Sequence, residues 1–253
     1  MDGDYAEFID GLEAHVSGVW KELTAPPKPM TRYRREHFPR TKSELREAPS
    51  LPWGTPPLPA KQYRIIVSDP AWKYSNENVE GAAAKKYPTL SVEQMSLLDV
   101  QSLNHPEGTT HFMWATMPLL ADALTLMKNW GYEYKTTAFV WVKTRGVDDK
   151  GDPKLYSGLG NYTNSNIEIV LLGRSKGLML EREDKAVKQV VIAPVGEHSA
   201  KPAEVRDRIV QLYDDEPRLE MFARVAPKGW DVWGNQAPLS KTAAMKIAPK
   251  QKP

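Results

Sequence analysis

The body of the chain alternates apolar runs with amphipathic stretches, a pattern typical of strands and helices in turn. Strands are expected at 63–68, 109–115, 138–143, 167–172, 189–192 and 219–223, and helices at 92–103, 118–129 and 202–213. Strands that alternate with helices predict a mostly parallel sheet with helices on both faces. The fold class is therefore predicted to be α/β and Rossmann-like, in a domain that spans residues 61–238.

Two longer segments, 73–90 and 144–165, interrupt this alternation. Glycine, asparagine and charged residues concentrate in the second of them. Both follow predicted strand ends, where an open α/β sheet binds its ligand. They are predicted either to be lids over a site or to be plain surface loops.

The N-terminal part of the chain has a different pattern. Residues 1–24 are predicted to form an amphipathic helix, because the following apolar residues recur at three- and four-residue spacing: Tyr5, Phe8, Ile9, Leu12, Val16, Val19, Trp20 and Leu23. This helix either packs on the body or docks a partner subunit or a second copy. Residues 25–60 hold nine of the 21 prolines (positions 26, 27, 29, 39, 49, 52, 56, 57 and 59), which predicts an extended arm.

Charge is distributed unevenly although the formal net charge is only +2. Residues 1–24 carry −5, residues 25–50 carry +4 and the last thirteen carry +4, which leaves −1 for the rest. The basic segments suit contact with nucleic-acid phosphates, with a merely solubilising role as the alternative. Residues 239–253 are predicted to be a basic, disordered tail.

The composition also excludes several classes of function. No apolar run approaches 18 residues and no signal-peptide pattern opens the chain, so a soluble, cytoplasmic protein without membrane contact is expected. Cysteine is absent, which excludes thiolate metal sites and the cysteine nucleophile used to methylate ring carbon five of cytosine. The five histidines have no metal-ligand spacing, so no metal is expected. Neither a G-x-G-x-x-G sequence after a strand nor a P-loop is present.

The tetrapeptide Asp69-Pro70-Ala71-Trp72 follows the apolar run 65–68 and carries the strongest chemical signal. The exocyclic amine of a nucleobase is a poor nucleophile, because its lone pair is delocalised into the ring. A carboxylate from Asp69 and the carbonyl of Pro70 can both accept hydrogen bonds from this amine and restore the lone pair. Trp72 offers a face on which an extruded base can stack. Asp69, Pro70 and Trp72 are therefore the predicted catalytic residues.

Three downstream segments complete a known pattern: HSAKP at 198–202, PRLEMFAR at 217–224 and GWDVWGNQ at 229–236. In this order after an aspartate-proline-X-tryptophan motif, they resemble the MT-A70 family of adenine-N6 methyltransferases over roughly residues 60–238. The family includes messenger-RNA enzymes and short microbial and phage DNA enzymes. The resemblance implies a permuted S-adenosylmethionine-dependent methyltransferase fold, in which the catalytic motif precedes the cofactor motif. The family usually has a second proline where this chain has Ala71.

The same resemblance implies roles for residues outside the tetrapeptide. Lys201 is placed at the carboxylate of S-adenosylmethionine, and Arg224, Asn235 and Gln236 at its ribose, with Glu220 ordering them. Phe222 is included beside them, although a place in the core is preferred for it. The predicted cofactor-binding residues are Asp69, Lys201, Glu220, Phe222, Arg224, Asn235 and Gln236.

Further residues are predicted to contact the target base. By resemblance, Ser199 and Glu168 line the base pocket, although Glu168 could also be a plain surface acid. Tyr74 and Tyr87, in the first interrupting segment, could clamp nucleic acid or be ordinary loop aromatics. Together with Trp72, these four residues are the substrate candidates.

The resulting hypothesis is methyl transfer from S-adenosylmethionine to N6 of adenine, in DNA rather than RNA. DNA is favoured because of the resemblance to short microbial and phage members and the lack of cysteine-based zinc fingers. The alternatives are adenine-N6 methylation of RNA, cytosine-N4 methylation of DNA, and a catalytically silent scaffold that binds nucleic acid.

Overall fold

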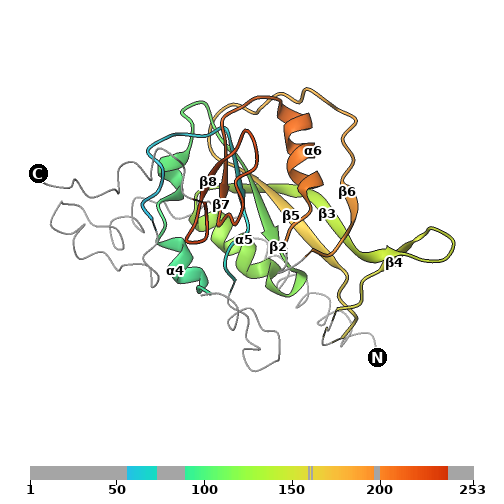
Figure 1. Cartoon of the computed structure of the whole chain (residues 1–253). Helices are drawn as coiled ribbons and strands as arrows, with labels where there is room; N and C mark the ends of the chain where they lie inside the picture. The colour runs from blue at the N-terminus through green and yellow to red at the C-terminus, as the bar shows by residue number, and fades with distance from the viewer. Residues whose placement is uncertain (1–55, 73–88, 159, 161, 197–199, 239–253) are drawn as a thin grey trace, which may run out of the picture. The chain divides into compact units, whose positions relative to one another are not determined.

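The computed structural model describes residues 56–72, 89–158, 160, 162–196 and 200–238 (Figure 1). The predicted N-terminal helix, most of the proline-rich arm and the basic tail lie outside these residues. In chain order the elements are β1 (Ile65–Ser68), α4 (Val92–Ser96), η2 (Val100–Leu103), β2 (Thr110–Ala115), η3 (Met117–Leu119), α5 (Leu120–Asn129), β3 (Glu133–Val147), β4 (Pro153–Leu155), β5 (Ile167–Arg174), β6 (Val190–Pro194), α6 (Ala203–Tyr213), β7 (Arg218–Met221) and β8 (Asp231–Trp233).

The strands form one mixed sheet in the order β4-β3-β5-β2-β1-β7-β8, with β6 paired to β3 beside β4. Strands β2, β1, β7 and β8 are mutually parallel, and β6 is parallel to β3. Strand β5 runs antiparallel to both of its neighbours, β2 and β3. The predicted mostly parallel sheet is therefore wrong. No helix lies between β3 and β5 in the described chain, whereas consecutive parallel strands are usually joined by a helix.

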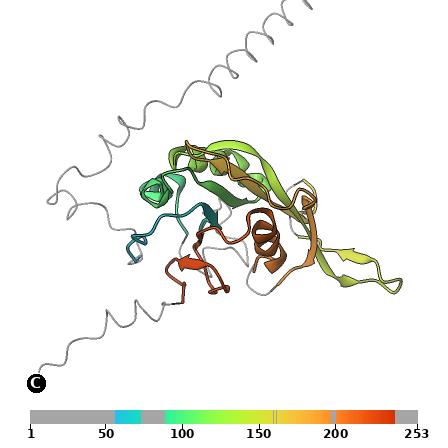
Figure 2. The same cartoon turned by 90° about the horizontal axis from the view of Figure 1, so that it is seen from above.

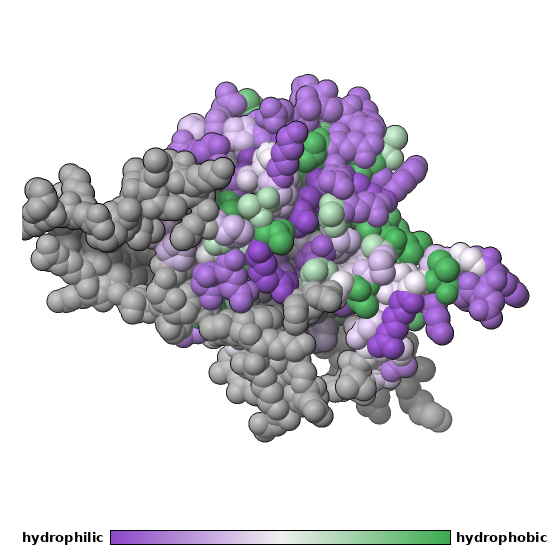
Figure 3. Space-filling model, viewed as in Figure 1, coloured by the Kyte–Doolittle hydropathy of each residue, from purple (hydrophilic) through white to green (hydrophobic). Residues whose placement is uncertain are grey.

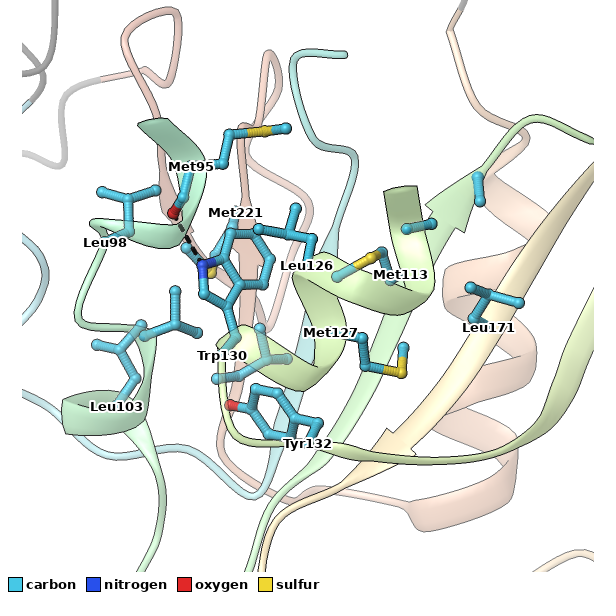
Figure 4. Close-up of a cluster of buried hydrophobic side chains, with 14 of the residues drawn as sticks. Met95, Leu98, Leu103, Met113, Leu126, Met127, Trp130, Tyr132, Leu171 and Met221 are labelled. Carbon is cyan, nitrogen blue, oxygen red and sulfur yellow. Dashed lines mark hydrogen bonds between the residues drawn. The ribbon is translucent and has the colours of Figure 1, made fainter. Parts of the chain in front are cut away.

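The sheet has an apolar core on each face. On one face, α4 and α5 contribute Met95, Ala123, Leu126 and Met127 to a cluster with strand residues such as Met113 (Figure 4). Within it the indole N–H of Trp130 donates to the Met95 carbonyl at 2.9 Å. On the other face, α6 contributes Val205 and Ile209 to a second cluster. Figure 2 shows these helices on opposite sides of the sheet.

Several element boundaries differ from the sequence prediction. The helix expected at 92–103 ends at Ser96, and the chain continues as the 3-10 turn η2. The apolar periodicity misled here because Leu98, Val100 and Leu103 are buried after the helix has ended. Strands β4 and β8 were not predicted, since segments of three residues carry too little pattern.

Strand β3 extends well beyond the predicted 138–143 and forms a hairpin with β4 from part of the second interrupting segment. The hairpin projects from the sheet (Figures 1 and 2). Its residues Val147 and Leu155 are exposed. Figure 3 shows a described surface that is mostly hydrophilic, with hydrophobic residues gathered where this hairpin projects. Whether the segment acts as a lid stays a prediction.

Several strand ends meet at one edge of the sheet. The carboxyl ends of the parallel strands β1, β2 and β7 lie at this edge. Because β5 is antiparallel to β2, its amino end lies at the same edge, where Ile169 pairs with Ala115. Strand β3 is antiparallel to β5, so its second half returns there, and β6 ends beside it.

Candidate active site

The tetrapeptide forms a tight turn directly after β1. The backbone N–H of Trp72 donates to the Pro70 carbonyl at 2.8 Å, and the N–H of Leu90 donates to the Ala71 carbonyl at 2.8 Å. The backbone N–H of Asp69 faces the carbonyl of Met221 at the end of β7, at 3.5 Å. The turn is thus tied to the neighbouring strand and to the chain that returns at residue 90. The Asp69 side chain stays 25% exposed.

A chain of ion pairs leads from Asp69 into the mixed part of the sheet. The Lys201 ammonium lies 3.3 Å from Asp69 Oδ1 and 2.9 Å from Glu168 Oε2. The other carboxylate oxygen of Glu168, Oε1, lies 2.6 Å from the Lys143 ammonium. The side chains of Glu168, Lys201 and Lys143 are at most 16% exposed. Two carboxylates and two ammonium groups therefore alternate, with Asp69 partly exposed at one end and the other three groups buried or nearly so.

Two tryptophans form a wall beside these charges. The Lys201 ammonium lies 5.5 Å from the ring centroid of Trp114, and the Lys143 ammonium lies 5.2 Å from that of Trp141. The two indoles meet edge to face at 6.1 Å. A cation that lies over an aromatic face in a desolvated site is stabilised by the ring quadrupole.

The sheet topology explains why residues so distant in sequence meet. Asp69 follows the carboxyl end of β1, whereas Glu168 lies near the amino end of the reversed strand β5. Lys143 lies in the second half of β3, and Lys201 follows β6, which is parallel to β3. All four positions are at the same edge of the sheet.

The site shifts the ionisation of these groups in different directions. Burial raises the pKa of the Asp69 carboxyl, and Lys201 lowers it only in part. Burial also acts to raise the pKa of Glu168, but the charges of Lys201 and Lys143 outweigh it and hold that pKa below its ordinary value. For Lys201, burial is outweighed by Asp69 and Glu168, which raise the pKa of the ammonium well above its usual range. Of the two carboxylates, Asp69 is therefore the easier one to protonate.

A second ion pair lies on the parallel side of the sheet. Arg206 of α6 donates from one guanidinium nitrogen to both carboxylate oxygens of Glu220, at 3.1 and 3.4 Å. Burial raises the pKa of Glu220, the charge of Arg206 lowers it, and the charge of Asp69 raises it again. The half-buried Arg224 lowers the pKa of both Asp69 and Glu220 through its charge. Predicted cofactor residues thus influence one another electrostatically.

The turn after β7 has an unusual backbone. Phe222 has a φ of 60°, in the left-handed region that non-glycine residues seldom adopt. Its ring packs against Trp130 and, edge to face, against Trp233. A Cβ atom on Gly234 would approach the Cα of Phe222 to 2.9 Å, so only glycine fits there. Asn235 and Gln236 follow this contact and are exposed, which leaves their side chains accessible to a ligand.

The remaining predicted site residues are only partly described. Trp72 is just 6% exposed, and its indole N–H faces the Trp114 carbonyl at 3.3 Å. It lies in the core cluster beneath α4 and α5, so base stacking by Trp72 stays a prediction. Ser199, Tyr74 and Tyr87 lie outside the described residues.

Two residues that contact the predicted site were not found by sequence reasoning. Lys143 ends the strand expected at 138–143, and a lysine after an apolar run was not distinguished from a surface residue. Arg206 lies on α6, five positions after Lys201, where a charged residue fits a solvated helix face equally well. Only the pairing of β3 with β5, and the ion pair between α6 and β7, reveal their carboxylate partners.

Two searches confined to the described residues give negative results. No helix there has the length and apolar character that crossing a membrane requires. No group of three or more histidine and acidic side chains in the same residues has a geometry that could hold a metal ion.

The fold and site together define an α/β protein with a buried acid–lysine cluster at the carboxyl ends of its central strands. Comparison with known proteins identifies the family within this class. The sequence profile of the MT-A70 family matches residues 63–236, and the chain belongs to this family. The family membership predicted from the sequence is confirmed.

Individual relatives differ in how much of their length is matched. The type II methyltransferase M.MunI of Mycoplasma sp is 34% identical over 204 residues, 74% of this chain and 82% of the relative. The probable N(6)-adenosine-methyltransferase MT-A70-like protein of Oryza sativa is 28% identical over 178 residues, 69% of this chain but 23% of the relative. The N(6)-adenosine-methyltransferase catalytic subunit METTL3 of Homo sapiens is 26% identical over 179 residues, or 28% of its length. The chain thus spans about a quarter of these two adenosine methyltransferases.

Proposed function

We propose that this protein transfers the methyl group of S-adenosylmethionine to the N6 amine of adenine in DNA. Methylation of adenine N6 is the activity of its family. Beyond that activity, we propose the cofactor, the choice of DNA as the polymer, and the role of each residue. The observation that carries it is the convergence of Asp69, Lys201 and Glu168 at the end of β1.

The chemistry of the donor groups fits S-adenosylmethionine. Lys201 offers a buried cation for the carboxylate of its methionine part, and Asp69 offers an acceptor for the α-ammonium group. Arg224, Asn235 and Gln236 follow β7 and β8 and can donate to ribose hydroxyls, with Glu220 ordering Arg224 by charge. When bound, the cofactor supplies a methyl group on a positively charged sulfur.

The turn at the end of β1 fits an amine as the acceptor of this methyl group. Asp69 is partly exposed and offers carboxylate lone pairs. The Pro70 carbonyl already accepts one hydrogen bond, from the Trp72 N–H, and a carbonyl oxygen has a second lone pair. Two acceptors aimed at one N–H₂ group orient it and stabilise the positive charge that develops on nitrogen.

The proposal also includes an acceptor for the proton that the reaction releases. An N–H₂ group that gains a methyl group must lose one proton to become neutral. Asp69 is hydrogen-bonded to the amine in the proposed complex, and burial raises its pKa. It is therefore the first acceptor of this proton, whereas Glu168 stays charged between two lysines.

DNA is favoured over RNA by the pattern of similarity. The type II methyltransferase M.MunI is matched over most of its length, as is this chain. The chain also resembles the short microbial and phage members of the family, which act on DNA. The larger adenosine methyltransferases share only a region of similar size.

The test is incorporation of labelled methyl groups from S-adenosylmethionine into DNA and RNA, followed by separation of the nucleosides. N6-methyladenine in DNA, lost in Asp69→Asn and retained in the control Asp122→Asn on the exposed side of α5, supports the proposal. Methyl label found only in RNA would contradict DNA as the substrate. N4-methylcytosine as the product would contradict adenine as the target base. A protein that neither binds the cofactor nor transfers methyl groups is the silent scaffold instead.

A further inference from the structure

We propose that Lys143 is a positioning residue: it is the fixed counter-ion of Glu168, and it frees Lys201 to bind the carboxylate of the cofactor. This inference rests on the proposed function, because it takes the cofactor to be S-adenosylmethionine.

The two lysines of the cluster differ in how many carboxylates they contact. Lys201 is shared between Asp69 and Glu168, at 3.3 and 2.9 Å. Among the described residues Lys143 has a single carboxylate partner, Glu168, at the shorter distance of 2.6 Å. Each oxygen of Glu168 thus faces a different lysine. If Lys201 turns toward a third carboxylate, Glu168 keeps one partner.

The backbone around Lys143 holds it in place. Lys143 lies in β3 and pairs with Ala193 of β6. Its N–H donates to the Asn166 carbonyl, and its own carbonyl accepts from the Tyr156 N–H, both at 2.8 Å. Its ammonium lies over the ring of Trp141, which pairs with Glu168 across the two strands. Lys201, in contrast, lies in the connection before α6 and not in a strand.

Without Lys143, cofactor binding would carry an electrostatic penalty. In the part of the chain that the structure describes, the charged groups that face Glu168 are Lys143 from β3, Lys201 from the segment before α6, and Asp69 from the turn after β1. Glu168 is 8% exposed, so its charge cannot rely on water. Breaking a buried ion pair from one side is costly because the remaining charge is left uncompensated. With Lys143 in place, Lys201 can leave Glu168 without this cost.

The decisive experiment compares two ligands in three variants. The ligands are S-adenosylmethionine and 5′-deoxy-5′-methylthioadenosine, which has the adenine and ribose but no amino-acid carboxylate. The variants are Lys143→Met, Lys143→Arg and the matched control Lys135→Met. Lys135 is on the same strand and has a short ion pair with Glu133, but both side chains are exposed. Calorimetry of each protein gives Kd and, in buffers of different ionisation enthalpy, the number of protons taken up.

In Lys143→Met we expect Kd for S-adenosylmethionine to rise about tenfold, the effect of about 1.4 kcal/mol of lost compensation. Kd for 5′-deoxy-5′-methylthioadenosine should change less than about twofold, because this ligand has no carboxylate and Lys201 keeps its ion pair with Glu168. Lys143→Met should also take up a proton with S-adenosylmethionine that the wild-type protein does not, because Glu168 loses both partners and neutralises. Lys143→Arg and Lys135→Met should both behave as wild type.

Other results overturn the inference. Unchanged affinity of Lys143→Met for S-adenosylmethionine, or equal weakening of both ligands, would show that Lys143 does not govern Lys201. If the wild-type protein fails to bind S-adenosylmethionine, the proposed function is overturned as well. This failure is distinct from a failure of the inference alone, which appears only in the Lys143 variants.

Discussion

The two parts of the sheet contribute to the site in different ways. The parallel part, β2-β1-β7-β8, brings Asp69 and Glu220 to the site from the carboxyl ends of its strands. The mixed part, β3, β5 and β6, brings Glu168 from the start of a reversed strand, with Lys143 beside it. In a wholly parallel sheet the amino end of β5 would lie at the opposite edge. The reversal therefore places a second carboxylate within reach of Lys201, at a distance of 2.9 Å.

The comparison predicts that Asp69 and Glu168 have different roles, with Asp69 the one that takes part in the reaction. Asp69→Asn keeps the size of the side chain but removes the negative charge and the proton acceptor. We expect kcat to fall by about 10³-fold, within the range for loss of an acid–base group or a preset electrostatic partner. Single-turnover methyl transfer with labelled cofactor measures this loss, and thermal unfolding should show an unchanged or higher Tm. Activity within tenfold of wild type would contradict the assignment of Asp69.

Lys201 links the two parts, so its removal should affect both. We expect Lys201→Met to weaken binding of S-adenosylmethionine by about 10²-fold, through loss of a buried charge-assisted contact. Lys201 lowers the pKa of Asp69, so the variant should have a higher Asp69 pKa. In the proposed mechanism Asp69 acts in its ionised form, as the acceptor of the amine proton, so the acid limb of the pH profile of kcat should move to higher pH. An unchanged acid limb would show that Asp69 and Lys201 are not coupled.

The parallel part also has a buried histidine that makes it sensitive to acid. His111 of β2 is fully buried, its Nε2 lies 2.8 Å from Ser68 Oγ, and its Nδ1 has no hydrogen-bond partner among the described residues. Burial lowers the pKa of His111 to about 3. The unfolded chain, with an ordinary pKa of about 6.5, binds more protons between these values, so stability is lost as pH falls below about 6.5.

We expect His111 alone to remove about 2 kcal/mol of the free energy of unfolding between pH 7 and pH 5. Urea unfolding at a series of pH values measures this slope. The variant His111→Gln keeps a polar partner for Ser68 and should lose the slope in this interval. An identical pH dependence in the variant would assign the acid sensitivity to other groups.

The smallest expected effect tests the ion pair of the parallel part. Arg206→Met removes the partner of Glu220, whose pKa should then rise further because Arg206 lowers it. We expect KM for S-adenosylmethionine to rise about tenfold with kcat nearly unchanged, since binding of the ribose end is equal in ground and transition states. Steady-state kinetics separates the two constants, with Arg208→Met as a control on the same helix. A fall in kcat without a change in KM would place Arg206 nearer to the reaction than proposed.

The sequence was sufficient to locate the turn at Asp69, which the structure places directly after β1, but not to predict the residues around it. Asp69 could be found because an acid, a proline and a tryptophan follow a buried strand in one short motif. The direction of β5 could not be found, because the same apolar run fits a parallel or an antiparallel neighbour. The lack of a helical pattern in residues 144–165 could have indicated that β5 runs antiparallel to β3. Lys143 and Arg206 depend on contacts across strands and between a helix and a strand, which a single sequence does not reveal.

The bridge between the two ends of residues 73–88 has a consequence for how this protein could diversify. The N–H of Leu90 donates to the carbonyl of Ala71, and Trp72 pairs with Leu90, so the chain leaves and rejoins the described structure at one place. These two contacts hold the turn at Asp69 from the side where the chain rejoins the described structure. Doubling the length of a flexible connection between two fixed ends costs only about 0.6 kcal/mol of closure entropy, so a longer flexible insertion between Trp72 and Leu90 would cost the turn little.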